Sequence, residues 1–256
     1  MKILIQKKID ILEKEQGIKI LLACETGSRA WGFPSPDSDY DVRLLYVHPI
    51  EWYLKLNAAR DTIDVMYEQN EIDISGWDLK KTLHLLWKSN AGLTERIQSP
   101  IIYRADAVFL KGINTIAKQR YARIAAMHHY LSMATKNYEV LMSKDSYKLK
   151  QFFYALRAAF ACKWILEKEL IVPIVFSTML NELEIDKGLH KRISELINLK
   201  SVSSEAYVHQ GESALLNLIG NFINLAESQK DKLPAGEQNM PAFNEFFIST
   251  LKRVWT

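Results

Sequence analysis

Residues 18–47 read IKILLACETGSRAWGFPSPDSDYDVRLLYV, and this stretch decides the fold. Its two apolar ends, residues 18–24 and 40–47, have the length and composition of β-strands. The segment between them is rich in Gly, Ser and Pro, which interrupt regular structure. The stretch therefore predicts two strands joined by a loop, with polar residues where the first strand ends and the second begins.

Two acidic residues stand at the start of the second strand. Asp39 and Asp41 are two positions apart, and because side chains alternate along a strand they share one face. Paired carboxylates there can chelate a hard cation. At the end of the first strand, Gly27 lets the backbone approach a ligand closely and Ser28 offers a hydroxyl, so both can contact phosphate oxygens.

A purely structural interpretation of the same residues also exists. Gly27 and Ser28 can form an ordinary turn, and acids on an edge strand protect it from aggregation. Arg43 lies on the same face as Asp41, where it can contact a nucleotide or balance the carboxylates. Arg29 can contact phosphate or pair with a nearby acid.

The remainder of the chain divides into a mixed first half and a helical second half. Up to about residue 105 the pattern predicts a helix over 3–14 that ends at Gly17, strands over 62–67 and 71–74, and a helix from 77 or 78 to 88. Beyond it, helices are predicted over 107–142, 145–169, 181–198, 211–229 and 243–254. We therefore expect an α+β fold, with a small mixed sheet in residues 1–105 and an α-helical domain in residues 106–256.

One of the predicted helices carries a basic and aromatic stripe. Lys150, Tyr154 and Arg157 are spaced so that they lie on one side of the helix over 145–169. This side can face a cleft and contact a ligand, or it can be a solvated face opposite an apolar core.

Composition excludes several classes of protein. With 33 basic and 30 acidic residues, the net charge of +3 is too small to indicate nucleic-acid binding. The two cysteines have no CxxC spacing, no apolar stretch reaches the roughly 20 residues of a membrane helix, and the first residues are too charged for a signal peptide. We expect a cytoplasmic protein without a membrane partner. The absence of GxxxxGK[ST] and of GxGxxG argues against a P-loop ATPase and a simple dinucleotide fold.

The motif in residues 27–41 resembles a known signature. Gly27-Ser28, ten further residues and then Asp39-Tyr40-Asp41 is similar to the signature of the DNA polymerase β-like nucleotidyltransferase superfamily. GSRAWGF and DSDYDVR more narrowly resemble the RlaP/YcgL type of bacterial nucleotidyltransferases, which are associated with RNA repair. The resemblance extends through EIDISGWDLKK, SNAGLTERIQSPIIYR and KQFFYALRAAFACKWI, and so covers most of the chain.

The resemblance implies an activity. Such enzymes move a nucleoside monophosphate from an NTP, here expected to be ATP, to a hydroxyl and release pyrophosphate. Two Mg²⁺ ions, or Mn²⁺, would be held by Asp39, Asp41 and a third carboxylate, for which Asp73 is the first choice and Asp64 the alternative. Asp73 is also a possible general base.

The resemblance also implies a nucleotide site. Gly27 and Ser28 would hold the β and γ phosphates, with Arg29, Arg43 and the Lys150, Tyr154 and Arg157 stripe as further nucleotide contacts. The acceptor can be an RNA 3′ end, a small molecule or a protein side chain.

Two alternatives belong to other classes of protein. The first is a non-catalytic module that binds a nucleotide or RNA and has lost turnover. The second is a helical interaction protein whose second half is the working surface. Retention of partner binding after Asp41→Ala would favour the interaction protein over the enzyme.

Overall fold

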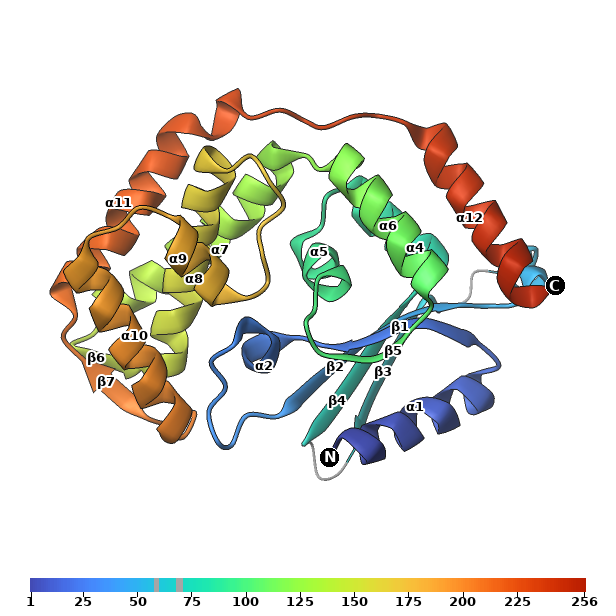
Figure 1. The fold of residues 1–256 in the computed structure, drawn as a ribbon, viewed down its shortest axis with the longest axis horizontal. Helices are drawn as coiled ribbons and strands as arrows, with labels where there is room; N and C mark the ends of the chain where they lie inside the picture. The colour runs from blue at the N-terminus through green and yellow to red at the C-terminus, as the bar shows by residue number, and fades with distance from the viewer. Residues whose placement is uncertain (58–59, 68–70) are drawn as a thin grey trace. The chain divides into compact units, whose positions relative to one another are not determined.

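The computed structural model describes residues 1–57, 60–67 and 71–256 and divides into two compact units (Figure 1). Each unit is built from segments that are far apart in the sequence. The first consists of Met1–Gly27, Asp39–Tyr121 and Glu237–Thr256, and the second of Ser28–Ser38 and Ala122–Gly236.

The first unit is built on a five-stranded sheet with the order β3-β4-β2-β1-β5. β2 and β4 run parallel, whereas the other neighbouring pairs are antiparallel, so the sheet is mixed as predicted. The strands are β1 (Lys19–Glu25), β2 (Tyr40–Val47), β3 (Thr62–Tyr67), β4 (Ile72–Asp78) and β5 (Ile102–Ala105). The strands predicted over 40–47 and 62–67 are confirmed at both ends.

One face of this sheet is covered by α1 (Lys2–Gln16) (Figure 1). Ile5 and Ile9 of α1 are fully buried and belong to one core with Val42 of β2 and Ile74 of β4. The helix ends at Gly17, whose φ of 60° is the left-handed conformation in which a glycine closes a helix. Since alternate residues of β2 and β4 are used by this core, their other side chains are left for the opposite face.

Helices α4 (Leu79–Trp87), α5 (Ala91–Ile97) and α6 (Ala107–Arg120) cover the opposite face (Figure 1). Each begins with a polar side chain that accepts a backbone N–H of the first turn: Asp78 at 2.8 Å, Asn90 at 3.0 Å and Asp106 at 2.9 Å. Such caps satisfy amides that the helix itself leaves unbonded. They fix where each helix leaves the sheet.

The second unit is helical apart from one two-stranded ribbon. Its centre is the packing of α7, α8 and α11, and the segment 28–38 joins this core because the Phe33 ring packs against Phe153, with ring centroids 4.8 Å apart and an interplanar angle of 30°. The elements are α2 (Gly27–Trp31, continuing from the first unit), α7 (Arg123–Met142), β6 (Ser146–Lys148), α8 (Leu149–Glu167), α9 (Phe176–Glu182), α10 (Lys187–Val202), β7 (Val208–Gln210), α11 (Ser213–Gln229) and η2 (Lys230–Lys232).

The predicted helix over 107–142 is wrong as one element. α6 ends at Arg120 and α7 begins at Arg123, with Tyr121 and Ala122 in non-helical conformations between them. Neither residue is a helix breaker, so the sequence carries no local signal for the break. The break coincides with the boundary between the two units.

The observed ends of other helices also differ from the predicted ones. The first residues of the predicted helix over 145–169 form β6, which pairs with β7, so α8 begins only at Leu149. The helix predicted over 181–198 is α10, delayed to Lys187 because the Asp186 side chain caps it there. α5 and β5 were not anticipated.

The compact units also differ from the predicted domains at 1–105 and 106–256. α12 (Met240–Trp255) belongs to the first unit, because it packs on α6 and α4. A Cβ at Gly112 of α6 would lie 2.4 Å from the Phe246 ring, so glycine permits this close approach. Within the described residues, none of the helices combines the length and apolarity needed to cross a bilayer.

Candidate active site

Asp41 and Asp73 lie side by side at the start of two parallel strands. They are register partners on β2 and β4, and their side chains are 27% and 28% exposed. Arg43, on the same face, donates from Nη2 to Asp41 Oδ1 at 2.7 Å and to Asp73 Oδ2 at 2.8 Å. A single guanidinium therefore joins both carboxylates.

Arg43 is also fixed by the backbone. Its Nη1 donates to the carbonyl oxygens of Val42 and Asp73, each at 3.2 Å. A planar guanidinium with several acceptors is held in one orientation. The sequence left two roles open for Arg43, contact with a nucleotide and neutralisation of the carboxylates. In this geometry Arg43 neutralises the carboxylates.

Gly27 stands against the Asp41 carboxylate. Its φ is +62°, and a Cβ built there would lie 2.0 Å from Asp41 Oδ2. Both the left-handed backbone and the lack of space require glycine at this position. The end of β1 can therefore approach the carboxylate more closely than any side chain would permit.

Glu25 supports the Asp41 backbone from the interior of the protein, a role that was not predicted from the sequence. It is fully buried; its Oε1 accepts the Asp41 N–H at 2.6 Å, and its Oε2 accepts the Tyr103 hydroxyl. Thr26 adds two donors to the Asp41 carbonyl, its N–H at 2.9 Å and its hydroxyl at 3.1 Å. The only sequence signal was an acid at the inner end of an apolar strand.

Arg96 places a second cation beneath this face. It is 6% exposed, its guanidinium carbon lies 3.3 Å from the centre of the Trp77 ring, and its Nη1 donates to Leu44 O at 3.3 Å. Burial, together with the nearby Arg43 charge, lowers the pKa of Arg96 to about 9. At neutral pH the site therefore contains two guanidinium charges beside the two carboxylates.

The other candidate acids are placed differently. Asp39 is exposed and precedes β2. Asp64, on the edge strand β3, is 58% exposed and pairs with Arg60 at 2.6 Å. Asp73, rather than Asp64, is thus the carboxylate that lies beside Asp41.

The fit of a divalent cation rests on these acids. Within residues 1–57, 60–67 and 71–256, no three His, Cys, Asp or Glu side chains are grouped as metal ligands, so Asp39, Asp41 and Asp73 do not form such a set. Asp41 and Asp73 nevertheless offer adjacent, partly exposed carboxylate oxygens, the donor type that Mg²⁺ and Mn²⁺ prefer. The pair fits a hard cation as two of its ligands.

Ser28 and Arg29 belong to the second unit. The Ser28 hydroxyl donates to Ser38 Oγ at 3.1 Å, and Ser38 Oγ donates to Glu205 Oε1 at 2.9 Å. Arg29 Nη2 donates to the Ser38 carbonyl at 2.5 Å. Both predicted phosphate-binding side chains therefore make contacts within the 28–38 segment.

The predicted stripe on α8 is split between different environments. Lys150 pairs with Glu205 at 2.7 Å, whereas Tyr154 packs edge-on against Trp31, with centroids 5.2 Å apart. Arg157 is 2% exposed, and its guanidinium lies 4.5 Å from the centre of the Trp31 ring. A solvated basic face is therefore wrong for Arg157, whose charge is buried against an aromatic ring.

Together, a mixed sheet with paired carboxylates on parallel strands and a helical unit define the class: an α+β protein with a candidate nucleotide-transfer site. The sequence matches the RlaP family, described as the RNA repair pathway DNA polymerase beta family, over residues 1–249. The chain belongs to this family, which supports a nucleotidyltransferase-type role. The resemblance predicted from the motifs is thereby confirmed.

The chain is also similar to individual proteins. The chain is 34% identical over 245 residues to the uncharacterized protein YcgL of Bacillus subtilis (strain 168). These aligned residues cover 95% of this chain and 94% of that protein. Among solved structures it is similar to a nucleotidyltransferase-like protein from Exiguobacterium sibiricum 255-15, with 11% identity, 97% of this chain and 80% of that chain covered, and a TM-score of 0.34.

Proposed function

We propose that the protein transfers a nucleoside monophosphate from an NTP, ATP in the first instance, to a hydroxyl group, with the end of an RNA as the acceptor. The observation that carries the proposal is the pairing of Asp41 with Asp73 across two parallel strands. The name of the family, which refers to RNA repair, is the reason for choosing RNA.

The reaction forms one P–O bond, breaks one P–O bond and moves one proton. The acceptor oxygen attacks the α-phosphorus, the bond from this phosphorus to the bridging oxygen of the β-phosphate breaks, and pyrophosphate leaves. Asp73 takes the proton of the acceptor hydroxyl as general base. Asp41 and Asp73 would hold a divalent cation, Mg²⁺ or Mn²⁺, which would neutralise phosphate charge.

Residues around the pair supply orientation. Because Gly27 has no side chain, the end of β1 lies directly against the Asp41 carboxylate, and its backbone would meet a phosphate group held by a cation at that carboxylate. Ser28 would exchange its hydrogen bond to Ser38 for a phosphate oxygen. Glu25 keeps the Asp41 backbone in place, which preserves the geometry on which transfer depends.

One observation favours a second candidate function. Arg43 already neutralises both carboxylates through ion pairs of 2.7 and 2.8 Å. A site whose acids are satisfied by an internal cation can bind a nucleotide without turnover. The second candidate is therefore a non-catalytic nucleotide-binding or RNA-binding module.

Transfer of label from each α-³²P-NTP to RNA, with Mg²⁺ or Mn²⁺ present, tests the first candidate. We expect Asp41→Asn and Asp73→Asn to lower transfer by about 10²-fold or more, as for loss of one electrostatic group at a reacting centre. Asp64→Asn is the matched control, because Asp64 is exposed and paired elsewhere, and it should retain full transfer.

The outcomes separate the two candidates. Transfer that is equal in wild type and Asp73→Asn would contradict the site assignment. Metal-dependent NTP binding that needs Asp41, without transfer to RNA or other hydroxyl compounds, would favour the non-catalytic module.

A further inference from the structure

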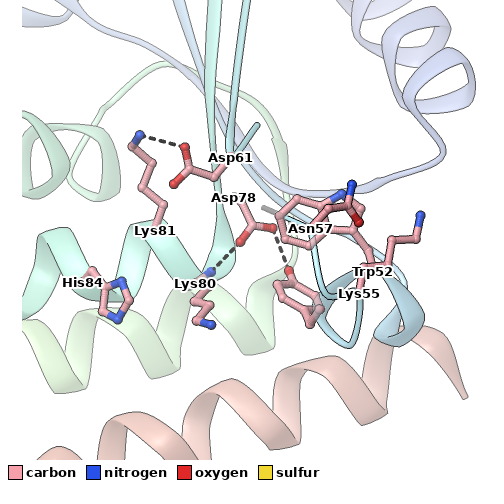
Figure 2. A pocket seen from close by; sticks show the side chains of 9 residues that line it. Trp52, Lys55, Asn57, Asp61, Asp78, Lys80, Lys81 and His84 are labelled. Carbon is pink, nitrogen blue, oxygen red and sulfur yellow. Dashed lines mark hydrogen bonds and ion pairs between the residues drawn. The ribbon is translucent and has the colours of Figure 1, made fainter. Parts of the chain in front are cut away.

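A cavity lies at the opposite ends of the two strands that carry the carboxylates. Asp73 is the second residue of β4 and Asp78 the last, so about 16 Å of strand separates them at about 3.3 Å per residue. Asp78 lines a pocket of about 300 Å³ within the first unit (Figure 2). This pocket is therefore distinct from the Asp41 and Asp73 pair.

The polar floor of the pocket is fixed by Asp78. This fully buried carboxylate accepts the Tyr53 hydroxyl at 2.6 Å and the Lys80 N–H at 2.8 Å, and it lies 3.1 Å from His48 Nδ1. Burial and the Asp78 charge raise the pKa of Tyr53, so its hydroxyl remains a donor. Asp78 is thus occupied by the protein itself and caps α4.

Trp52 gives the pocket a rigid aromatic wall. Its ring is stacked on His48 with centroids 4.0 Å apart and an interplanar angle of 8°. Since His48 is itself held by Asp78, the position of Trp52 depends on the same buried acid. The wall is consequently formed before any ligand arrives.

Three lysines make the lining basic. Lys81 is paired with Asp61 at 2.9 Å, but in the described part of the chain no ion pair joins Lys55 or Lys80 to an acid. Lys55 comes from the same side of the pocket as Trp52, and Lys80 from α4 on the other side (Figure 2). Two ammonium groups are therefore available to an anion that enters.

An apolar pocket of about 150 Å³ adjoins this basic one. Lys80 and His84 line both, and the second is completed by aromatic rings that include Trp87, Phe243 and Phe247. Trp87 packs edge-on against Phe243 with centroids 5.2 Å apart. A ligand that spans both pockets has an anionic end and a flat apolar end.

We propose that these joined pockets bind a nucleoside monophosphate unit. Its phosphate is held by Lys55 and Lys80, and its base lies against Trp87 and Phe247. Charge-assisted bonds to phosphate and stacking of a base on aromatic rings are the interactions that this lining offers. The unit can be a free mononucleotide or the 5′-phosphorylated end of a polynucleotide.

Calorimetry with the Asp73→Asn variant in EDTA tests the proposal, because the carboxylate site is then disabled. The probes are AMP, GMP, CMP and UMP, inorganic phosphate, and an oligoribonucleotide with or without a 5′-phosphate. We expect saturable binding of a mononucleotide or of the 5′-phosphorylated oligoribonucleotide alone. The first result identifies the free nucleotide as ligand, and the second the polynucleotide end.

Charge variants locate the binding. In the same background, Lys55→Ala with Lys80→Ala should weaken it at least tenfold, whereas Lys88→Ala should leave it within twofold, since Lys88 is exposed just beyond α4 and does not line either pocket. The proposal is overturned if none of the nucleotide probes binds, if inorganic phosphate binds as tightly as they do, or if the double variant binds as well as its parent. These outcomes leave the proposed transfer reaction unaffected.

Discussion

Gly27 and Asp41 are so close that a methyl group on residue 27 would lie 2.0 Å from the Asp41 carboxylate oxygen. Gly17 provides a matched comparison, because its φ of +60° is nearly the same as the +62° of Gly27 while nothing lies within 4 Å of its would-be Cβ. The two glycines therefore separate the cost of the backbone conformation from the cost of the contact.

We expect Gly17→Ala to lower the free energy of unfolding by about 1–2 kcal/mol, the cost of a left-handed L-residue. Gly27→Ala should cost about 1–3 kcal/mol more, because the carboxylate must move. It should also abolish nucleotide transfer. Urea denaturation of both variants provides the measurement, and equal losses would show that Asp41 moves away freely.

The Glu25 carboxylate allows a prediction about the interior. Glu25→Gln keeps the shape but replaces one acceptor by a donor: the amide oxygen can still accept the Asp41 N–H, whereas the amide nitrogen can only donate to the Tyr103 hydroxyl oxygen, so the hydrogen bond from Tyr103 to a charged acceptor is lost. We expect a loss of about 1–3 kcal/mol in unfolding free energy. Tyr103→Phe removes only one donor and should cost less.

A double-mutant cycle on Glu25 and Tyr103 measures their coupling. If the hydrogen bond between them contributes, the loss of unfolding free energy in the double variant will differ by more than about 0.5 kcal/mol from the sum of the losses in the two single variants. Strict additivity would mean that the two side chains act independently.

The sequence predicts the features that depend on residues close together in the chain, and does not predict those that depend on residues far apart. The strand over 40–47 was predicted correctly because composition and length are local properties, and the choice of Asp73 came from the position of EIDISGWD in the family pattern. The burial of Arg157 against Trp31 was not predictable, because it depends on residues far apart in the chain. For the same reason Glu25 looked like the end of a strand rather than a support for Asp41.

Asp106 gives a pH-dependent prediction. It caps α6 through the Phe109 N–H and pairs with Arg253 of α12 at 2.7 Å. Burial raises the pKa of Asp106, but the Phe109 amide and the Arg253 guanidinium outweigh burial and hold the pKa below its ordinary value. Because the folded state favours the charged form, Asp106 stabilises the fold above its unfolded pKa, and this contribution disappears as the pH falls through the lower, folded pKa.

The Asp106→Asn variant isolates this charge, since asparagine is an equally good helix cap. We expect it to unfold more readily than wild type at neutral pH, by about 0.5–1 kcal/mol for a partly exposed pair. The difference should vanish once the pH lies below the lowered pKa of Asp106 in the folded state, where the wild-type carboxyl is protonated as well. A constant difference between about pH 2 and about pH 7 would assign the loss to the cap instead.

Arg43 and a divalent cation are predicted to compete for the same carboxylates. Arg43→Ala removes the guanidinium that joins Asp41 to Asp73, so the two negative charges face each other without an internal cation. Mn²⁺ should then bind about five- to tenfold more tightly, because partly exposed ion pairs are worth about 1 kcal/mol. Arg60→Ala is the control, since Arg60 forms an exposed pair with Asp64 of the edge strand. Electron paramagnetic resonance of free Mn²⁺ measures both affinities. Weaker binding after Arg43→Ala would mean that the guanidinium orients the carboxylates for the metal rather than opposing it.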